Sequence, residues 1–207
     1  MVKINKSIFS RAIYYLEHHE KSMRVPAWII RHQKEVFFIA YRMGEVLGFA
    51  SENLTALAIT ARFHDIGKSN IDPGIINNQG VLSDAQRYEV FEHVLFSYQI
   101  LKKKGINSKI ILKSVFHHHE NYDGSGYPDK LRATEIPVFA QILRIADSFS
   151  AMLGARPYRN PKGKNFKSAL TQIENGRGTF YNPKMVDVFL RILQTPDKSD
   201  LIPGLNY

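Results

Sequence analysis

Residues 117–128, HHHENYDGSGYP, place three consecutive histidines directly before a glycine-rich segment. Imidazoles are common metal ligands, whereas two glycines followed by Tyr-Pro favour a turn. The histidines end an apolar segment, residues 110–116, so they lie inside the chain, where a terminal affinity tag is not expected. This stretch therefore predicts a metal site next to a recognition loop.

The composition indicates one globular domain. The chain has 207 residues, of which 44% are hydrophobic and 23% are charged, enough to bury one substantial core and too short to require two. No cysteine is present, which excludes disulfides, thiolate metal sites and cysteine nucleophiles. Any site must therefore use histidines, carboxylates or hydroxyls.

Apolar residues recur at helical spacing along most of the chain, and no segment alternates as a β-strand does. Helices are expected over residues 28–47, 54–63, 83–101, 106–116, 138–153, 165–174 and 183–193. Gly48 is suited to end the first helix, Ser83 and Gln86 form a capping box, and Pro183 fits a first helical turn. The predicted fold is all-α, with the polar chemistry in the connections.

The organisation is simple. We expect an amphipathic helix over residues 1–24, rather than a signal peptide or membrane span. The domain is expected over residues 25–194 and a C-terminal tail over residues 195–207. We expect a cytoplasmic protein without membrane association. A net charge of +9 favours anionic partners, whether nucleic acid, phosphorylated metabolites or an acidic protein surface.

Several polar residues stand at helix ends or among apolar residues. His64 and Asp65 follow the apolar segment 54–63, and burying an unpaired carboxylate costs several kcal/mol. Adjacent helical residues diverge by roughly 100°, so this pair would approach one metal together only where the helix frays. A buried ion pair between Asp65 and Lys68 is the alternative.

The remaining candidates are ambiguous when taken one at a time. Asp147 lies in an apolar run where only Arg144 offers a local partner, so it is either an ion pair or a metal ligand. His93, expected in the middle of the capped helix, also fits a hydrogen-bonded boundary residue. His32 also fits a surface histidine.

Together these residues resemble the HD-GYP family in type, order and spacing. The resemblance covers residues 27–193 and rests on His32, His64-Asp65, Gly67-Lys68, His93, the sequence HHENYDGSGYP at 118–128, Asp147 and Arg156-Pro157-Tyr158-Arg159. It implies an α-helical HD-domain bundle with a glycine-rich GYP loop.

The resemblance also implies two divalent metal ions. One would be held by His32, His64, Asp65 and Asp147, and the second by His93, His118 and His119, with Asp65 bridging. His117 is left outside this set. Ligation by nitrogen and oxygen alone suits iron or manganese better than a closed thiolate zinc site.

The implied activity is hydrolysis of cyclic di-GMP to the linear dinucleotide pGpG, and possibly to GMP, by a metal-bridging hydroxide. Asp65 and Lys68 would serve catalysis, with Lys68 also contacting a phosphate oxygen. Arg156 and Arg159 would hold the second phosphate or a guanine face. Gly124 and Tyr127 would border the substrate, and the loop could also meet diguanylate cyclase domains.

Two positions depart from the family pattern. Trp28 stands where members with a third metal carry a glutamate, which favours a two-metal site. Ser150 stands where many members carry a second aspartate, which is expected to remove a carboxylate from the neighbourhood of the site.

Other functions stay open. The substrate could be 3′,3′-cyclic GMP-AMP or another nucleotide, and a weakly active metal-binding adaptor could act through the GYP loop. Basic groups such as Lys102-Lys103-Lys104 make nucleic-acid binding a third possible function, but no nucleic-acid-binding motif accompanies them. The metal, the oligomeric state and the regulatory input are not determined by the sequence.

Overall fold

The structure is a computed structural model that describes residues 18, 27–78, 80–154 and 165–194. Within these ranges the chain forms helices and loops, with one isolated β-bridge between Arg177 and Tyr181, so the predicted all-α class is confirmed. The predicted helix at 1–24, the tail at 195–207, Arg156 and Arg159 lie outside the described residues.

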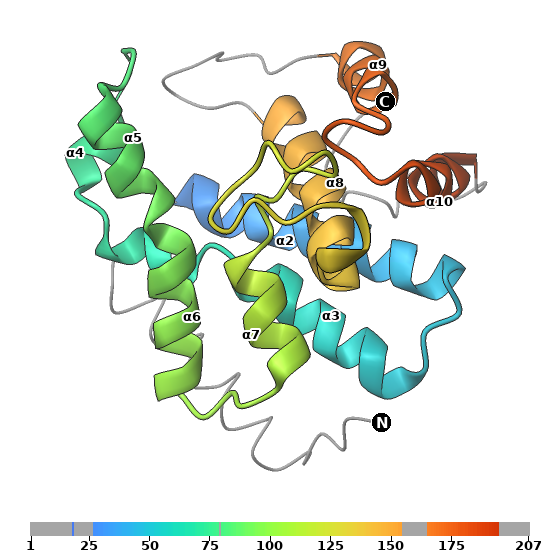
Figure 1. The fold of residues 1–207 in the computed structure, drawn as a ribbon, viewed down its shortest axis with the longest axis horizontal. Coiled ribbons are helices and arrows are strands. Elements are labelled where there is room, and N and C mark those ends of the chain that lie inside the picture. Colours follow the sequence, from blue (N-terminus) through green and yellow to red (C-terminus); the bar gives the residue numbers. More distant parts are fainter. Residues whose placement is uncertain (1–17, 19–26, 79, 155–164, 195–207) are drawn as a thin grey trace.

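The helical elements follow one another as shown in Figure 1. They are α2 (Ala27–Val46), α3 (Ser51–Phe63), the 3-10 helix η1 (Ile66–Asn70), α4 (Pro73–Ile76), α5 (Asp84–Phe91), α6 (His93–Lys103), α7 (Lys109–Phe116), the 3-10 helix η2 (Ala133–Glu135), α8 (Val138–Leu153), α9 (Phe166–Asn175) and α10 (Pro183–Gln194).

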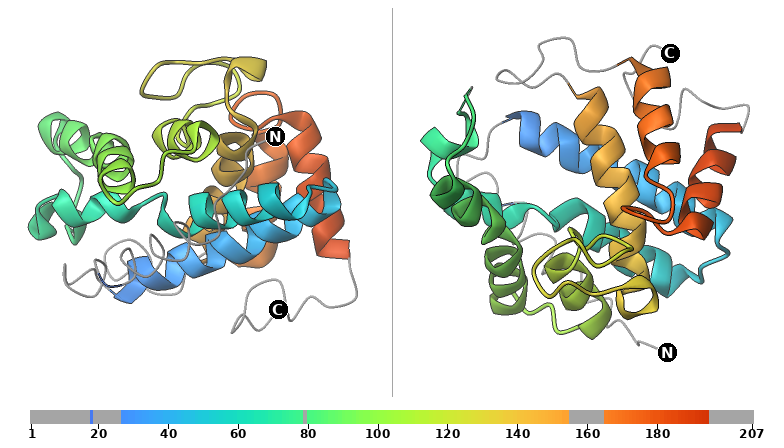
Figure 2. Two further views of the ribbon diagram at one scale, coloured as in Figure 1. Left: turned by 90° about the horizontal axis from the view of Figure 1, so that it is seen from below. Right: turned by 45° about the horizontal axis from the view of Figure 1, so that its top comes forward.

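The core lies where α8 packs against α2, with α3, α7, α9 and α10 around this pair. Its largest fully buried side chains include Phe63, Phe139, Phe149 and Phe189. Each such burial contributes about 1.5–3 kcal/mol. In Figure 2, left, the yellow loop after α7 lies above that helix, and α2 lies below it. None of the described helices has the length and apolar character needed to cross a bilayer.

Glycine caps fix two helix ends. Gly48 adopts φ +70°, its amide bonds to the Glu45 carbonyl, and the Phe49 amide bonds to the Gly44 carbonyl, so the predicted end of α2 is confirmed. The sequence prediction missed the equivalent cap at Gly105, which has φ +91°.

This second cap corrects the predicted helix over 106–116. The Ile106 amide reaches back to the Leu101 carbonyl, so buried Ile106 completes the cap of α6 instead of beginning α7. Helix α7 consequently starts at Lys109.

The predicted helix over 83–101 is wrong in its continuity. Its capping box is present, with Ser83 and Gln86 exchanging hydrogen bonds, but the helix breaks at Glu92 into α5 and α6. The His93 imidazole bonds to the Val90 carbonyl at 2.6 Å, which occupies a backbone acceptor at the break. Phe91, in the last turn of α5, remains 38% exposed.

Element η1 was not predicted, and Gly67 explains how closely it approaches α6. A Cβ atom at Gly67 would lie 2.2 Å from the carbonyl oxygen of His93 and 2.4 Å from the amide nitrogen of Ser97. The Gly67 amide donates instead to Ser97 Oγ at 2.8 Å. This contact fixes the turn after α3 directly beside α6.

Candidate metal centre

Histidines and aspartates from separate segments converge where α3 ends. One group of potential ligand atoms comes from Asp65, His93, His118 and His119, and a second from His32, His64, Asp65 and Asp147. Within each group the atoms lie within 4.8 Å of one another. The structure thus brings together all the residues that the sequence assigns to the metals, and Asp65 belongs to both groups.

The end of α3 allows His64 and Asp65 to face the same space. Helix α3 ends at Phe63, and Asp65 adopts φ −100° and ψ 7°, outside regular helical geometry. His64 Nε2 consequently lies 3.4 Å from Asp65 Oδ2. The Lys68 ammonium also contacts Asp65, so the ion pair that the sequence left as an alternative exists within the same cluster.

Local hydrogen bonds fix the orientation of three imidazoles. Each uses Nδ1 to contact the carbonyl three residues earlier: His64 with Ala61 at 2.8 Å, His93 with Val90 at 2.6 Å, and His118 with Val115 at 2.6 Å. A carbonyl only accepts, so each Nδ1 carries a proton and each Nε2 points away from the backbone. The three Nε2 atoms face the Asp65 carboxylate, with His93 Nε2 at 3.2 Å from Oδ1.

His32 and Asp147 complete the second group. His32 Nε2 lies 2.9 Å from Asp147 Oδ1, and both side chains are mostly buried. The alternative of an ion pair between Asp147 and Arg144 is wrong, because Arg144 donates to Asn121 at 2.9 Å and to Ser148 at 2.6 Å. Asp147 is therefore directed towards the histidines.

The carboxylates set the charge of the cluster. Burial favours the neutral form of His64, but Asp65 and Asp147 overcome this effect and raise its pKa to about 10. Burial opposes ionisation of Asp65 too, yet Lys68 and His64 hold the pKa of that carboxyl well below its usual range. Burial and neighbouring imidazoles keep the pKa of His118 and His119 well below the ordinary value.

The donor set fits metal ions. His64 Nε2 and Asp65 Oδ1 are buried and have no hydrogen-bond partner within the described ranges. Leaving such atoms unsatisfied costs about 1–3 kcal/mol each, whereas a divalent cation would accept lone pairs from both. The set is composed of imidazole nitrogens and carboxylate oxygens, which suit divalent transition metals.

The GYP loop contacts this centre through Tyr127. Its ring stacks between His119, with centroids 4.9 Å apart, and Phe91, with centroids 4.1 Å apart. Burial and the Asp65 charge raise the pKa of Tyr127, so the phenol is neutral. Gly126 allows the tight loop, because a Cβ there would lie 2.3 Å from the amide nitrogen of Asn121.

Other predicted loop and charge positions have definite places. Gly124 adopts φ +82° and packs against Arg132. The Lys68 side chain is 14% exposed at the edge of the cluster. His117, set aside by the sequence prediction, fastens the loop to α7: Nδ1 lies 2.8 Å from the Lys113 carbonyl and Nε2 lies 2.9 Å from Asp129.

The two departures from the family pattern differ in outcome. Trp28 packs against the cluster formed by Ile29, Ile71 and Ile76. At Ser150 the aspartate carboxylate is absent as expected, but the hydroxyl donates to Glu35 Oε2 at 2.6 Å and lies 2.8 Å from His32 Nδ1, so Glu35 provides a carboxylate nearby. The sequence prediction missed Glu35, whose signal is its position one helical turn after His32.

Comparisons with known proteins show which proteins this chain is similar to. A family model described as an HD domain matches residues 19–185. A cyclic di-GMP phosphodiesterase of Thermotoga maritima is 35% identical over 165 residues, covering 78% of this chain and 44% of that protein. A 3′3′-cGAMP-specific phosphodiesterase of Vibrio cholerae is 29% identical over 161 residues, covering 77% and 30%.

A solved structure shares the fold. An HDGYP protein of Bdellovibrio bacteriovorus superposes with a TM-score of 0.65 at 16% identity, covering 89% of this chain and 61% of that one. The chain spans less than half the length of the two curated relatives, at 44% and 30%.

Proposed function

The chain belongs to the HD domain family, and on this premise we propose that it is a metal-dependent phosphodiesterase that opens cyclic di-GMP to pGpG and can continue to GMP. The observation that carries the proposal is the pair of ligand groups sharing Asp65. Similarity to a protein named cyclic di-GMP phosphodiesterase supports the substrate class. A cytoplasmic location stays a prediction from the sequence.

Two divalent ions, iron or manganese, are proposed for the centre, one for each ligand group. When bound, such ions lower the pKa of a coordinated water and neutralise phosphodiester oxygens. The chain's own contribution is to keep the imidazoles aligned. Backbone carbonyls do this for His64, His93 and His118, because each carbonyl accepts a hydrogen bond from Nδ1–H and leaves Nε2 directed at the centre.

Lys68 is the proposed phosphate contact. Its ammonium is paired with Asp65, and it reaches solvent at the edge of the cluster. Sharing the Asp65 carboxylate with metal ions would weaken this pair and direct the ammonium to a substrate phosphate oxygen, where it stabilises developing negative charge. Arg156 and Arg159 are assigned to the second phosphate or a guanine face on the resemblance alone.

Tyr127 and Gly124 are proposed to form the substrate side of the centre. The stack of Phe91, Tyr127 and His119 places a neutral aromatic wall against a metal-ligand imidazole. Such a wall excludes water from one side of the reacting phosphate, which strengthens the electrostatic interactions there. The same loop is proposed as the contact for diguanylate cyclase domains.

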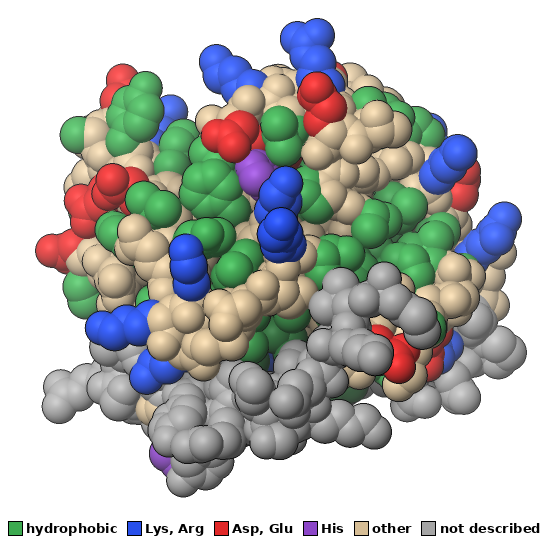
Figure 3. Space-filling view, turned by 60° about the horizontal axis from the view of Figure 1, so that its bottom comes forward, with side chains coloured by type: hydrophobic (Ala, Val, Ile, Leu, Met, Phe, Trp, Pro, Cys, Tyr) green, Lys and Arg blue, Asp and Glu red, His purple; other side chains and the backbone are tan. Residues whose placement is uncertain are grey.

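A second substrate, 3′,3′-cyclic GMP-AMP, is favoured by the similarity to the Vibrio cholerae enzyme. The ligand groups would act on the phosphates, whereas the two cyclic dinucleotides differ in one base, so these groups do not distinguish the two substrates. Nucleic-acid binding has less support. On the face of the molecule shown in Figure 3, Lys and Arg side chains are spread among neutral and hydrophobic ones.

The deciding experiment is a turnover assay. Anaerobically purified protein would be stripped with a chelator, reloaded with Fe²⁺ or Mn²⁺, and given each cyclic dinucleotide, with products separated by chromatography. We expect linear product only after reloading. Asp147→Asn should abolish turnover, whereas Asp187→Asn, which alters an exposed pair with Arg177, should not. Metal-loaded protein that binds either nucleotide without cleaving it would contradict the enzyme proposal and favour the adaptor.

A further inference from the structure

The geometry points to Glu35 as a positioning residue for His32, acting through the Ser150 hydroxyl. Ser150 Oγ lies 2.6 Å from Glu35 Oε2 and 2.8 Å from His32 Nδ1. The other ring nitrogen of His32 lies 2.9 Å from Asp147 Oδ1, inside the ligand group. The role rests on the proposed metal site, since it concerns how His32 presents Nε2 to that site.

The direction of the hydrogen bonds follows from the number of protons. A carboxylate only accepts, and the Ser150 hydroxyl has one proton, which it donates to Glu35. The hydroxyl oxygen can then only accept from His32, so Nδ1 carries the proton. The lone pair of His32 is consequently on Nε2 and is directed at Asp147 Oδ1. These two atoms are both acceptors, so a cation bound between them would be stabilised.

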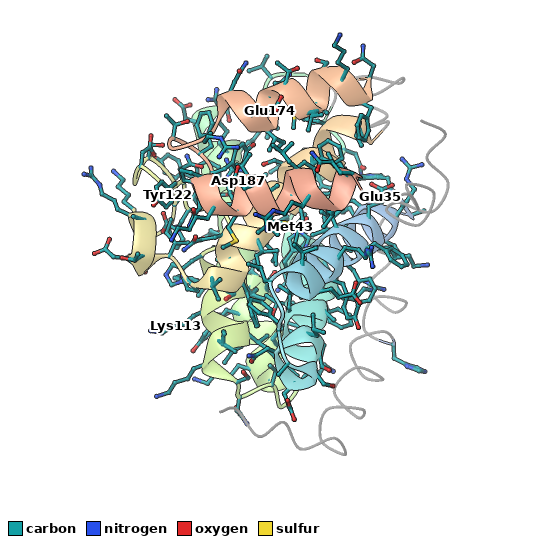
Figure 4. All side chains as sticks on the ribbon, turned by 90° about the vertical axis from the view of Figure 1, so that its right-hand side faces the viewer. Glu35, Met43, Lys113, Tyr122, Glu174 and Asp187 are labelled. Carbon is teal, nitrogen blue, oxygen red and sulfur yellow. The ribbon has the colours of Figure 1, made fainter. Side chains whose placement is uncertain are left out.

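Two helices build the relay. His32 and Glu35 lie one turn apart on α2, and Asp147 and Ser150 lie one turn apart on α8, so α8 supplies the contact to each ring nitrogen of His32 and α2 supplies the carboxylate behind Ser150. Helices α2 and α8 pack directly against each other. Figure 4 shows Glu35 on α2. The packing of these helices therefore sets the orientation of the imidazole.

The relay distinguishes His32 from the other fixed imidazoles. His64, His93 and His118 donate to neutral backbone carbonyls, whereas His32 donates through a hydroxyl to a carboxylate. Ser150 is 1% exposed, so the link is shielded from solvent. Glu35 is held from its outer side by Arg31, whose Nε lies 3.6 Å from Oε1.

A carboxylate behind an imidazole increases the basicity of the ligating nitrogen and fixes its tautomer. Loss of such an outer partner typically lowers metal affinity by about 10–100-fold. We expect this loss in Ser150→Ala, which removes the whole link. A smaller loss is expected in Glu35→Gln, because the amide oxygen still accepts from the hydroxyl but carries no charge.

The test measures metal binding and the state of His32, without turnover. Affinities for Mn²⁺ would come from competition with a chelator, and the His32 tautomer from long-range ¹H–¹⁵N spectra of protein loaded with diamagnetic Zn²⁺. Glu45→Gln is the matched control, because Glu45 lies on the same helix and pairs only with Arg42 in the described structure, at 2.8 Å. Thermal unfolding of the metal-free variants would verify folding.

A rescue variant separates a relay from packing. Glu35→Ala combined with Ser150→Asp moves the carboxylate from α2 to α8 and into direct reach of His32 Nδ1. We expect this double variant to recover most of the affinity lost in Glu35→Ala and to restore the Nδ1-protonated spectrum.

The outcomes also separate the relay from the proposed function. Wild-type affinity and an unchanged His32 tautomer in Ser150→Ala would overturn the relay while leaving the metal centre intact. Failure of the wild-type protein to bind two ions would instead overturn the proposed centre, and the relay with it. Equal losses in Glu45→Gln and Glu35→Gln would also overturn the relay.

Discussion

Asp65 Oδ1 lies 3.2 Å from His93 Nε2, although the two residues belong to the turn after α3 and to the first turn of α6. The other oxygen of the same carboxylate faces His64 at 3.4 Å. One carboxylate thus joins the two ligand groups, so substitutions here and elsewhere in the cluster should have different consequences.

Substituting Asp65 should remove both ions, whereas substituting His93 should remove one. Asp65→Asn deletes the shared anionic ligand, and His93→Ala deletes a ligand of one group only. Metal content per chain, measured by plasma mass spectrometry after gel filtration, should fall to near zero in the first variant and by about half in the second. Equal losses in the two variants would contradict the bridging role.

The metal-free protein should lose stability as the pH rises from about 6.5 to about 10. The raised pKa of His64, about 10, means that its imidazolium stabilises the fold fully below the ordinary value of 6.5 and that this contribution disappears as the pH passes the raised value. His118 and His119 have lowered pKa values and are neutral throughout that window.

Thermal or urea unfolding across that pH range measures this effect. The slope attributable to one proton is at most about 1.4 kcal/mol per pH unit. His64→Gln should flatten it, because the titrating group is absent. A slope that persists unchanged in His64→Gln would assign the loss to other groups.

Gly67→Ala should destabilise the fold and displace Lys68. The added Cβ would meet the backbone of His93 and Ser97 at 2.2 Å and 2.4 Å, and backbone atoms cannot rotate away. Overpacking of this kind costs about 1–3 kcal/mol. Denaturant unfolding of Gly67→Ala should show this loss, while Gly80→Ala, where the nearest atom is 3.4 Å away, should change stability by no more than a few tenths.

Tyr127 should act through its ring rather than its hydroxyl. Tyr127→Phe keeps both stacks and removes a phenol that is neutral, so stability and KM should change little. Tyr127→Ala removes two aromatic contacts worth about 0.5–1.5 kcal/mol each and frees His119 on one side. We expect a lower unfolding free energy and a higher KM in Tyr127→Ala only. A matching loss in Tyr127→Phe would assign a role to the hydroxyl.

The sequence predicted helices well where the signal was local. Helix α8 has the predicted bounds, and the capping box at Ser83 and Gln86 is present, because both depend on residues within one or two turns. The continuity of α5 and α6 was mispredicted because the break at Glu92 directly precedes His93, whose imidazole contacts Asp65 from a different segment of the chain. The spacing of apolar residues does not indicate such a contact between distant residues.

By itself, the sequence determined the helical class and the identities of the candidate ligands. The structure added the bonds that orient three of them, each from Nδ1 to a carbonyl three residues earlier. The packing of α8 on α2 and of η1 on α6 decided which residues meet. It placed Glu35 behind His32 through Ser150, where the sequence indicated a missing carboxylate. Periodicity reports which face of a helix is buried, whereas contacts between distant residues depend on how the buried faces fit together.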